Sequence, residues 1–236
     1  PDDTVIPMLR KLDNVDYATF IELPGSASSL SPGVSAKEIF DDGEQLLDAC
    51  KELGLSIGAV MAVREAGLTG EAHAVDAMRR VLEVMREETT APIVNPQRSL
   101  GGLIGGEAKL VDASGRNDLS TSLMGAVQTD AVARAMAVLE RSATMGVIVA
   151  APTAGSAGVV PGCVLALADH LELDNEQVMD ALYCAAAIGL NLTTSACVAG
   201  AEGGCQAEVG SAAAMAAAAL VQMLGGTPEQ ALDASS

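Results

Sequence analysis

The spacing of apolar residues predicts α-helices along most of the chain. From residue 39 onward, apolar side chains recur three or four positions apart, which places them on one face of a helix. The clearest case is 70–88, whose apolar face consists of Val75, Met78, Val81, Leu82 and Met85. The same spacing predicts helices over about 119–145 and 175–190, and an uncharged apolar run predicts a buried helix over 209–224.

Capping and turn signals indicate where these helices begin and end. Ser35–Glu38 has the spacing of a capping box and starts the regular part of the chain. Asp174–Gln177 caps the helix that follows it. Gly225 and Gly226 end the alanine-rich helix, and Pro228 suits the first position of one more helix.

Helices and glycine-rich loops alternate, so we expect an all-α fold. The one strand-like stretch, Val147–Ala151, is too short to be assigned by periodicity. We expect a compact helical domain around the central Ala-rich helix at 209–224, with no sheet of more than two short strands and with glycine-rich loops forming the site. Residues 1–34, which include the linker-like Pro24–Gly33, form a separate tail before a domain that covers 35–236.

Composition narrows the function classes. Half of the residues are hydrophobic, but only two Phe, two Tyr and no Trp occur, so the core must be built from Ala, Leu, Val and Met, which let helices approach closely. The apolar run at 209–224 is shorter than the roughly 20 residues of a membrane span, so we expect a core helix and no membrane. The net charge of −18 argues against nucleic-acid binding, which requires clusters of Lys and Arg.

The five cysteines form an odd set without disulfide or CxxC spacing, and no signal peptide opens the chain, so we expect a cytoplasmic protein. Cys205 stands apart from the others, because it lies within Gly200–Gly210 among four glycines and beside Glu202 and Glu208. Glycines let a backbone approach whatever the sulfur holds. The alternative is a tight turn into a buried helix, with Cys205 as a small core residue.

Two further loops are candidates for ligand binding. In 152–158, the hydroxyls of Thr153 and Ser156 stand among glycines at a possible helix N-terminus, which suits a carboxylate; an ordinary N-cap would use the same residues. Residues 95–109 hold four glycines and end at Lys109, which offers a positive charge, as Arg98 does with weaker support. A surface loop is the alternative for this segment.

Three stretches together resemble one family. They are Pro152-Thr-Ala-Gly-Ser-Ala-Gly-Val-Val-Pro161, then Gly204-Cys-Gln-Ala-Glu-Val-Gly210 about fifty residues later, and the glycine-rich run at 101–109. Over about residues 40 to 236 the chain is similar to the alpha domain of iron-sulfur-dependent L-serine dehydratases (L-serine ammonia-lyases). The segment around Cys205 is the most specific of the three.

The resemblance implies conversion of L-serine to pyruvate and ammonia, with a [4Fe-4S] cluster as Lewis acid. It implies Cys205 as a cluster ligand and a substrate site at Thr153, Ala154, Gly155, Ser156 and Lys109. The family's other two cluster cysteines follow in a segment that this chain does not reach, so we expect them beyond residue 236. The resemblance also implies a beta subunit or beta domain and a homo- or hetero-oligomer.

Other functions remain possible from the sequence. A non-catalytic helical binding or scaffold subunit would explain the missing cluster cysteines. A pyridoxal-phosphate enzyme would need a Schiff-base lysine, and Lys109 lacks the surroundings for one. The sequence assigns no general base, since we expect both histidines, His73 and His170, on the surface. It also leaves L-serine and L-threonine unresolved, because a hydrophobic pocket discriminates one methyl group by only about 1–3 kcal/mol.

Overall fold

The computed structural model describes residues 40–115 and 125–236, and every regular element in these ranges is a helix. The elements are α2 (Gly43–Leu53), α3 (Ile57–Thr69), α4 (Glu71–Val94), α5 (Glu107–Gly115), α6 (Ala126–Ala143), η2 (Ala154–Ser156), α7 (Val159–His170), α8 (Asn175–Ser195), α9 (Gly200–Met223) and α10 (Pro228–Ala234). The expected all-α fold is confirmed.

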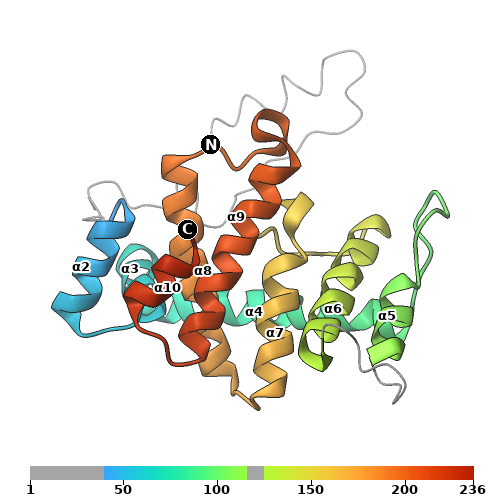
Figure 1. Cartoon of the computed structure of the whole chain (residues 1–236), viewed down its shortest axis with the longest axis horizontal. Helices are drawn as coiled ribbons and strands as arrows, with labels where there is room; N and C mark the ends of the chain where they lie inside the picture. Colours follow the sequence, from blue (N-terminus) through green and yellow to red (C-terminus); the bar gives the residue numbers. More distant parts are fainter. Residues whose placement is uncertain (1–39, 116–124) are drawn as a thin grey trace, which may run out of the picture. The chain divides into compact units, whose positions relative to one another are not determined.

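Helix α4 connects the other elements. It runs behind α8, α7, α6 and α5 (Figure 1) and contacts all four of them as well as α3. In front of it, α9 packs against α7, α8 and α10, and α6 packs between α7 and α5. Two helices that are distant in sequence, α3 and α8, also pack closely together.

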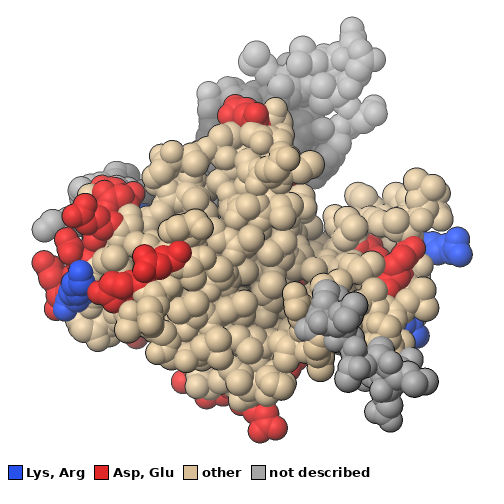
Figure 2. Space-filling view, in the orientation of Figure 1, with Lys and Arg blue, Asp and Glu red and all other residues tan. Residues whose placement is uncertain are grey.

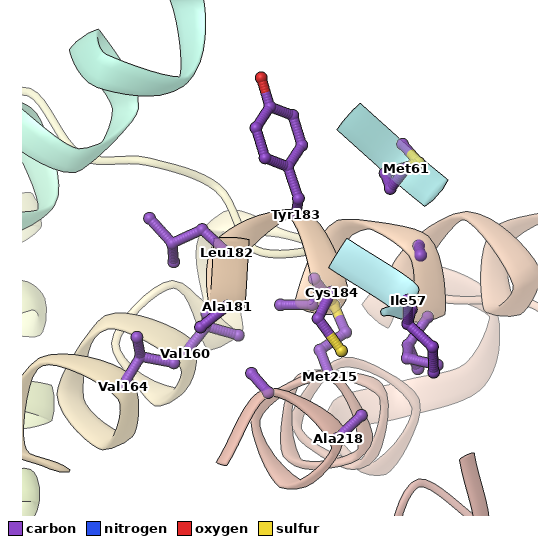
Figure 3. Close-up of a cluster of buried hydrophobic side chains, with 14 of the residues drawn as sticks. Ile57, Met61, Val160, Val164, Ala181, Leu182, Tyr183, Cys184, Met215 and Ala218 are labelled. Atoms are coloured by element: carbon purple, nitrogen blue, oxygen red, sulfur yellow. The ribbon is translucent and has the colours of Figure 1, made fainter. Parts of the chain in front are cut away.

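The core is centred on α7 and α8 and consists mainly of small aliphatic side chains (Figure 3). Nine residues of α8 are buried, from Val178 to Gly189, and Cys184 is fully enclosed among them. Burial raises the pKa of the Cys184 thiol, so it stays protonated and acts as a packing residue. The Tyr183 hydroxyl donates to the Ala74 carbonyl at 2.9 Å and so ties α8 to α4.

The Ala-rich helix α9 is buried along one stripe in its C-terminal half. The stripe consists of Ala212, Met215, Ala216, Ala218 and Ala219. By length and composition α9 could cross a membrane, and it is the one helix of the described ranges that could. Because this stripe packs against α7, α8 and α10, α9 serves as a packed helix of the fold.

Two helices begin with hydrogen-bonded caps at the positions that the sequence predicts. Asp174 and Gln177 form a reciprocal capping box before α8, and Thr227 and Gln230 form another before α10, with Pro228 at its first position. Each box satisfies two backbone N–H groups that a helix start would leave without partners. The proposed capping box at Ser35–Glu38 and the tail at 1–34 lie outside the described residues, so the domain division stays a prediction.

Two helices are longer than predicted. Helix α8 continues five residues past 190, and α4 continues to Val94, six residues past its predicted end, with Pro92 inside it. Proline removes one helical hydrogen bond. Burial of Thr89 and Pro92 against neighbouring helices compensates, because packing contributes more to helix stability in proteins than intrinsic propensity does. The predicted helix at 119–145 begins at Ala126 in the structure, and 116–124 lie outside the described residues.

The stretch Val147–Ala151 has no regular secondary structure, and no strand occurs in the described ranges. Its Val149 N–H donates to the buried carboxylate of Glu88 on α4 at 2.8 Å. The second carboxylate oxygen, Oε1, is buried without a hydrogen-bond partner. The Glu88 side chain thus fixes this segment to α4 through one hydrogen bond.

Glu88 should make stability depend on pH. Burial raises its pKa from an ordinary 4.5 to about 7, against the opposing effects of the Val149 N–H and Arg141. The folded state then binds more protons than the unfolded state between pH 4.5 and 7, so this group's contribution to stability is complete below pH 4.5 and is lost as pH rises to 7.

Chemical denaturation of the wild type and Glu88→Gln from pH 4.5 to 8 tests this. The variant retains an acceptor for Val149 without the charge, so its stability relative to the wild type should rise across this window. A difference that stays constant with pH would contradict the raised pKa. Figure 2 shows acidic side chains gathered over α2 and α10. Their effect on the pH dependence of stability is the same in both proteins, so it cancels when the variant is compared with the wild type.

Candidate functional site

The turn predicted to bind a ligand, residues 152–158, joins the segment 147–151 to α7. The Ala151–Pro152 peptide bond is cis, and Ala154–Ser156 form the single turn η2. Ser156 is buried, and its hydroxyl lies 3.3 Å from the Ala151 carbonyl oxygen as donor. Ala154 and Gly155 are exposed. The turn thus has a buried polar anchor and an open face.

Glycine allows this turn to sit directly against α6. A Cβ added at Gly158 would lie 2.5 Å from the carbonyl oxygen of Ala135, and one at Gly162 would lie 2.8 Å from that of Ala131. Real Cβ atoms do not come this close to backbone, so both positions need glycine. These two glycines therefore fix where the turn lies relative to α6.

The second segment forms the start of α9. Gly204 interrupts the helix with φ 75° and ψ −179°, a conformation that favours glycine, and Cys205 follows directly. The side chain of Cys205 is exposed, so the buried-core alternative for this cysteine is wrong. Cys197 is exposed as well, and its thiol lies 3.2 Å from the Glu202 carboxylate as donor.

Glu208 connects the two segments. The Thr153 hydroxyl donates to its carboxylate oxygen Oε1 at 2.6 Å, and Thr153 Oγ1 is 3.3 Å from Ser156 Oγ. Glu208 is half-buried and lies on α9 three residues after Cys205, so both side chains project from the same side of the helix. The structure thus brings together Thr153, Ser156 and the helix turn that carries Cys205.

The described contacts do not bring Lys109 to this cluster. It is exposed on α5, which packs on α4 and α6, and its Nζ donates to the Val94 carbonyl at 3.5 Å. Figure 1 shows α5 at the far side of α6 from α9. Arg98 is also exposed. A role for Lys109 in substrate binding stays a prediction.

The glycine-rich loop before α5 is held by a carboxylate of the chain itself. Glu140 on α6 is buried and accepts hydrogen bonds from the N–H groups of Gly106 at 2.9 Å and Ala108 at 2.8 Å. This satisfies donors at the start of α5. The amides that could have closed over a ligand at this point are therefore used in holding α5 to α6.

A cavity of about 310 Å³ lies beside the turn. Its lining comes from α6, Ile148, the 154–159 segment and α9, and includes Val132, Met136, Leu139, Val159 and Val209. No lining residue carries a charge. A zwitterionic amino acid would be poorly solvated inside it, so the polar cluster at Glu208 is the better candidate site.

The residues present supply only part of a cluster-binding site. In the two described ranges, no three His, Cys, Asp or Glu side chains are grouped to hold one metal ion. Cys205 fits as one thiolate, since it is exposed and follows a glycine that lets other groups approach. A [4Fe-4S] cluster needs at least two more thiolates. These residues alone therefore do not hold a complete cluster.

Sequence reasoning missed two residues of this region. Nothing in the sequence sets Cys197 apart from the other cysteines, but it is exposed and lies at the same helix end as Gly203, where an added Cβ would be 3.9 Å from its sulfur. Glu208 was noted only as an acidic neighbour of Cys205. Its three-residue spacing from Cys205 was a usable signal, whereas its contact with Thr153 depends on tertiary structure. Both histidines are on the surface, as expected.

Comparison with known proteins agrees with the local resemblance. A family model described as the serine dehydratase alpha chain matches residues 47–236. The chain is 41% identical over 198 residues to a probable L-serine dehydratase alpha chain of Bacillus subtilis, covering 83% of this chain and 65% of that one. It is 37% identical over 200 residues to the L-serine dehydratase alpha chain of Peptoniphilus asaccharolyticus, covering 84% and 68%.

Longer relatives match over the same region. The chain is 32% identical over 204 residues to L-serine dehydratase TdcG of Escherichia coli, covering 83% of this chain and 44% of that protein. The chain thus spans about two thirds of the alpha chains and less than half of this longer relative.

Proposed function

Because this chain belongs to the serine dehydratase alpha chain family, we propose that it is the alpha part of an enzyme that converts L-serine to pyruvate and ammonia. One observation carries the proposal. Two motifs that lie about fifty residues apart in the sequence meet in space, through the hydrogen bond from Thr153 to Glu208. A site built from both motifs has a thiolate ligand, hydroxyls and a carboxylate within a few turns of backbone.

We infer that the cofactor is a [4Fe-4S] cluster with Cys205 as one ligand. When bound, such a cluster supplies an open iron that acts as a Lewis acid toward the substrate hydroxyl and carboxylate. The remaining thiolates then come from outside these 236 residues, as does a beta subunit or domain. All five cysteines are free thiols, which suits a protein of the reducing cytoplasm.

The chain's own residues would bind and orient the substrate. Ala154 and Gly155 expose backbone beside Glu208, so a small amino acid can approach them. Thr153 and Ser156 already donate their hydroxyl hydrogens within the protein, to Glu208 and to the Ala151 carbonyl. We therefore assign backbone amides of the turn to the substrate carboxylate, and the two hydroxyls to keeping the turn and Glu208 in place.

Anaerobic purification of the full-length enzyme with its beta part tests the proposal. We expect iron and acid-labile sulfide in the ratio of a [4Fe-4S] cluster, and formation of pyruvate and ammonia from L-serine that stops on exposure to oxygen. A cluster-loaded enzyme without serine turnover would contradict it. If the purified protein contains no iron and adding iron does not change its stability, a non-catalytic helical binding or scaffold subunit is favoured. The incomplete set of cluster ligands in the described ranges is the observation behind this second candidate.

Thr153→Val should raise the KM for L-serine and leave the iron content intact. The variant preserves side-chain volume but removes the donor to Glu208, so a charge-assisted hydrogen bond worth about 1.5–3 kcal/mol is lost. We expect kcat/KM to fall by about 10- to 150-fold if this bond acts in full on substrate binding. Thr153→Ser retains the hydroxyl and should keep kcat/KM within about threefold of the wild type, a fraction of one hydrogen bond. Unchanged kinetics in Thr153→Val would remove Thr153 from the site.

A further inference from the structure

The carboxylate of Glu208 has an unusual environment for an acidic side chain. It is half-buried, and the Thr153 hydroxyl is its one hydrogen-bond donor in the described part of the chain. The ion pairs among these same residues do not include it. A carboxylate can accept about four hydrogen bonds, so most of its acceptor capacity is unused. Partial burial of an unpaired charge is costly, and a cationic ligand would relieve that cost.

Two glycines make room for this carboxylate from opposite segments. A Cβ added at Gly155 would lie 2.6 Å from Glu208 Oε2, and one added at Gly200 would lie 2.5 Å from the same atom. Any side chain at either position would displace the carboxylate. The Glu208 carboxylate thus packs against the backbone of both glycines and accepts a hydrogen bond from Thr153, and these three contacts orient it.

The neighbouring groups indicate which cation would bind. Cys205, the proposed cluster ligand, precedes Glu208 by three residues on the same side of α9. The exposed backbone of Ala154 and Gly155 lies beside the carboxylate. A ligand that spans these groups must carry a positive charge at Glu208 and polar groups directed toward the thiolate end. An α-amino acid has this arrangement, with its ammonium group a few bonds from its carboxylate and hydroxyl.

We propose that Glu208 binds the α-ammonium group of the substrate and that Thr153 is a positioning residue for Glu208; this inference rests on the proposed dehydratase function. An ammonium group donates up to three hydrogen bonds, which matches the unused acceptor capacity of the carboxylate. Binding pairs the charge of Glu208 in a half-buried site, where such a pair is stronger than in water. The contact makes the site specific for amino acids over hydroxy acids of the same shape.

The test uses the full-length, cluster-loaded enzyme with its beta part and compares two ligands. L-Serine carries the ammonium group, and L-glycerate has a hydroxyl in its place. Glu208→Gln keeps the side-chain shape and an oxygen that accepts from Thr153, but removes the charge. We expect its KM for L-serine to rise by about 10- to 100-fold, the worth of a hydrogen bond between charged groups. The inhibition constant of L-glycerate should stay within about threefold of the wild-type value, and the iron content should not change.

Two controls sharpen the interpretation. Glu202→Gln removes an acidic charge from the same helix end and should leave both constants unchanged. Thr153→Val combined with Glu208→Gln should weaken L-serine binding no further than Glu208→Gln alone, because Thr153 acts through the carboxylate.

Several outcomes would overturn the inference. Equal weakening of L-serine and L-glycerate would mean that Glu208 only supports the fold of the site. A loss confined to kcat, with an unchanged KM, would assign Glu208 to proton transfer. If the wild type is active and Glu208→Gln has the same KM for L-serine, this inference is overturned and the proposed function is not affected. A cluster-loaded wild type that neither binds nor converts L-serine would overturn the proposed function together with it.

Discussion

Cys205→Ser should abolish dehydratase activity and remove most of the iron from the full-length enzyme. Serine is close in size to cysteine but does not provide the thiolate that ligates an iron-sulfur cluster. The helical circular dichroism signal should change little, because Cys205 is exposed and the buried stripe of α9 begins seven residues later at Ala212. Iron and sulfide analysis, visible absorption and L-serine turnover measure the effect.

The other cysteines provide matched controls. Cys197→Ala alters an exposed thiol at the same helix end, while Cys163→Ala and Cys184→Ala alter thiols of the helix packing. All three variants should retain the cluster, and the two packing variants should lose about 1 kcal/mol of stability. A Cys205→Ser enzyme with full iron and normal turnover would refute the cluster assignment. Loss of iron in Cys197→Ala as well would indicate that this thiol is a second ligand.

Gly58→Ala should destabilise the fold by about 3 kcal/mol, at the upper end for an overpacked core. The added Cβ would overlap the carbonyl oxygen of Asp180 on α8 and would lie 2.7 Å from Nε2 of Gln222 on α9. It would also disturb the hydrogen bond from the Gly58 N–H to Gln222 Oε1, which is 3.1 Å long. Three helices meet at this glycine, so α3 would have to move away from α8.

Gly67→Ala is the control in the same helix. Nothing lies within 4 Å of the Cβ it would add, so the substitution should stabilise the protein by about 0.5–1 kcal/mol through the higher helix propensity of alanine. Denaturant midpoints at fixed slope measure both variants. If Gly58→Ala lowers the free energy of unfolding and Gly67→Ala raises it, glycine is required at position 58 because the helices approach closely there. A general intolerance of alanine in α3 would instead destabilise both variants. Equal effects would contradict the requirement at position 58.

The sequence predicted the helices well because local signals specify them. The reciprocal boxes at Asp174 and Thr227 each use groups only three residues apart, so they can be identified without tertiary structure. The ends of α4 and α8 were predicted too early, since burial of residues such as Pro92 depends on which helices lie alongside. The hydrogen bond that ties Val149 to α4 likewise involves Glu88, which is about sixty residues away.

The candidate site was predictable in its parts and not in its connections. Glycine and hydroxyl patterns identified the turn at Thr153 and the segment at Cys205 as chemically unusual. The contact between Thr153 and Glu208 spans 55 residues and leaves no periodic trace in the sequence. Lys109 looked equally suitable next to its glycines, but the fold holds its helix against α6, away from α9. Local composition identifies candidate site residues, but tertiary packing determines which of them lie close together.

The interruption of α9 at Gly204 divides the helix into a short and a long piece. Helical hydrogen bonds couple each turn to the next, and a residue with non-helical dihedral angles breaks that coupling. The short piece before Gly204 carries Gly200, whose backbone lies against the Glu208 carboxylate on the long piece. Cys205 is the first residue of the long piece, so the same stretch of helix that carries this exposed thiol is anchored in the core by its alanine stripe.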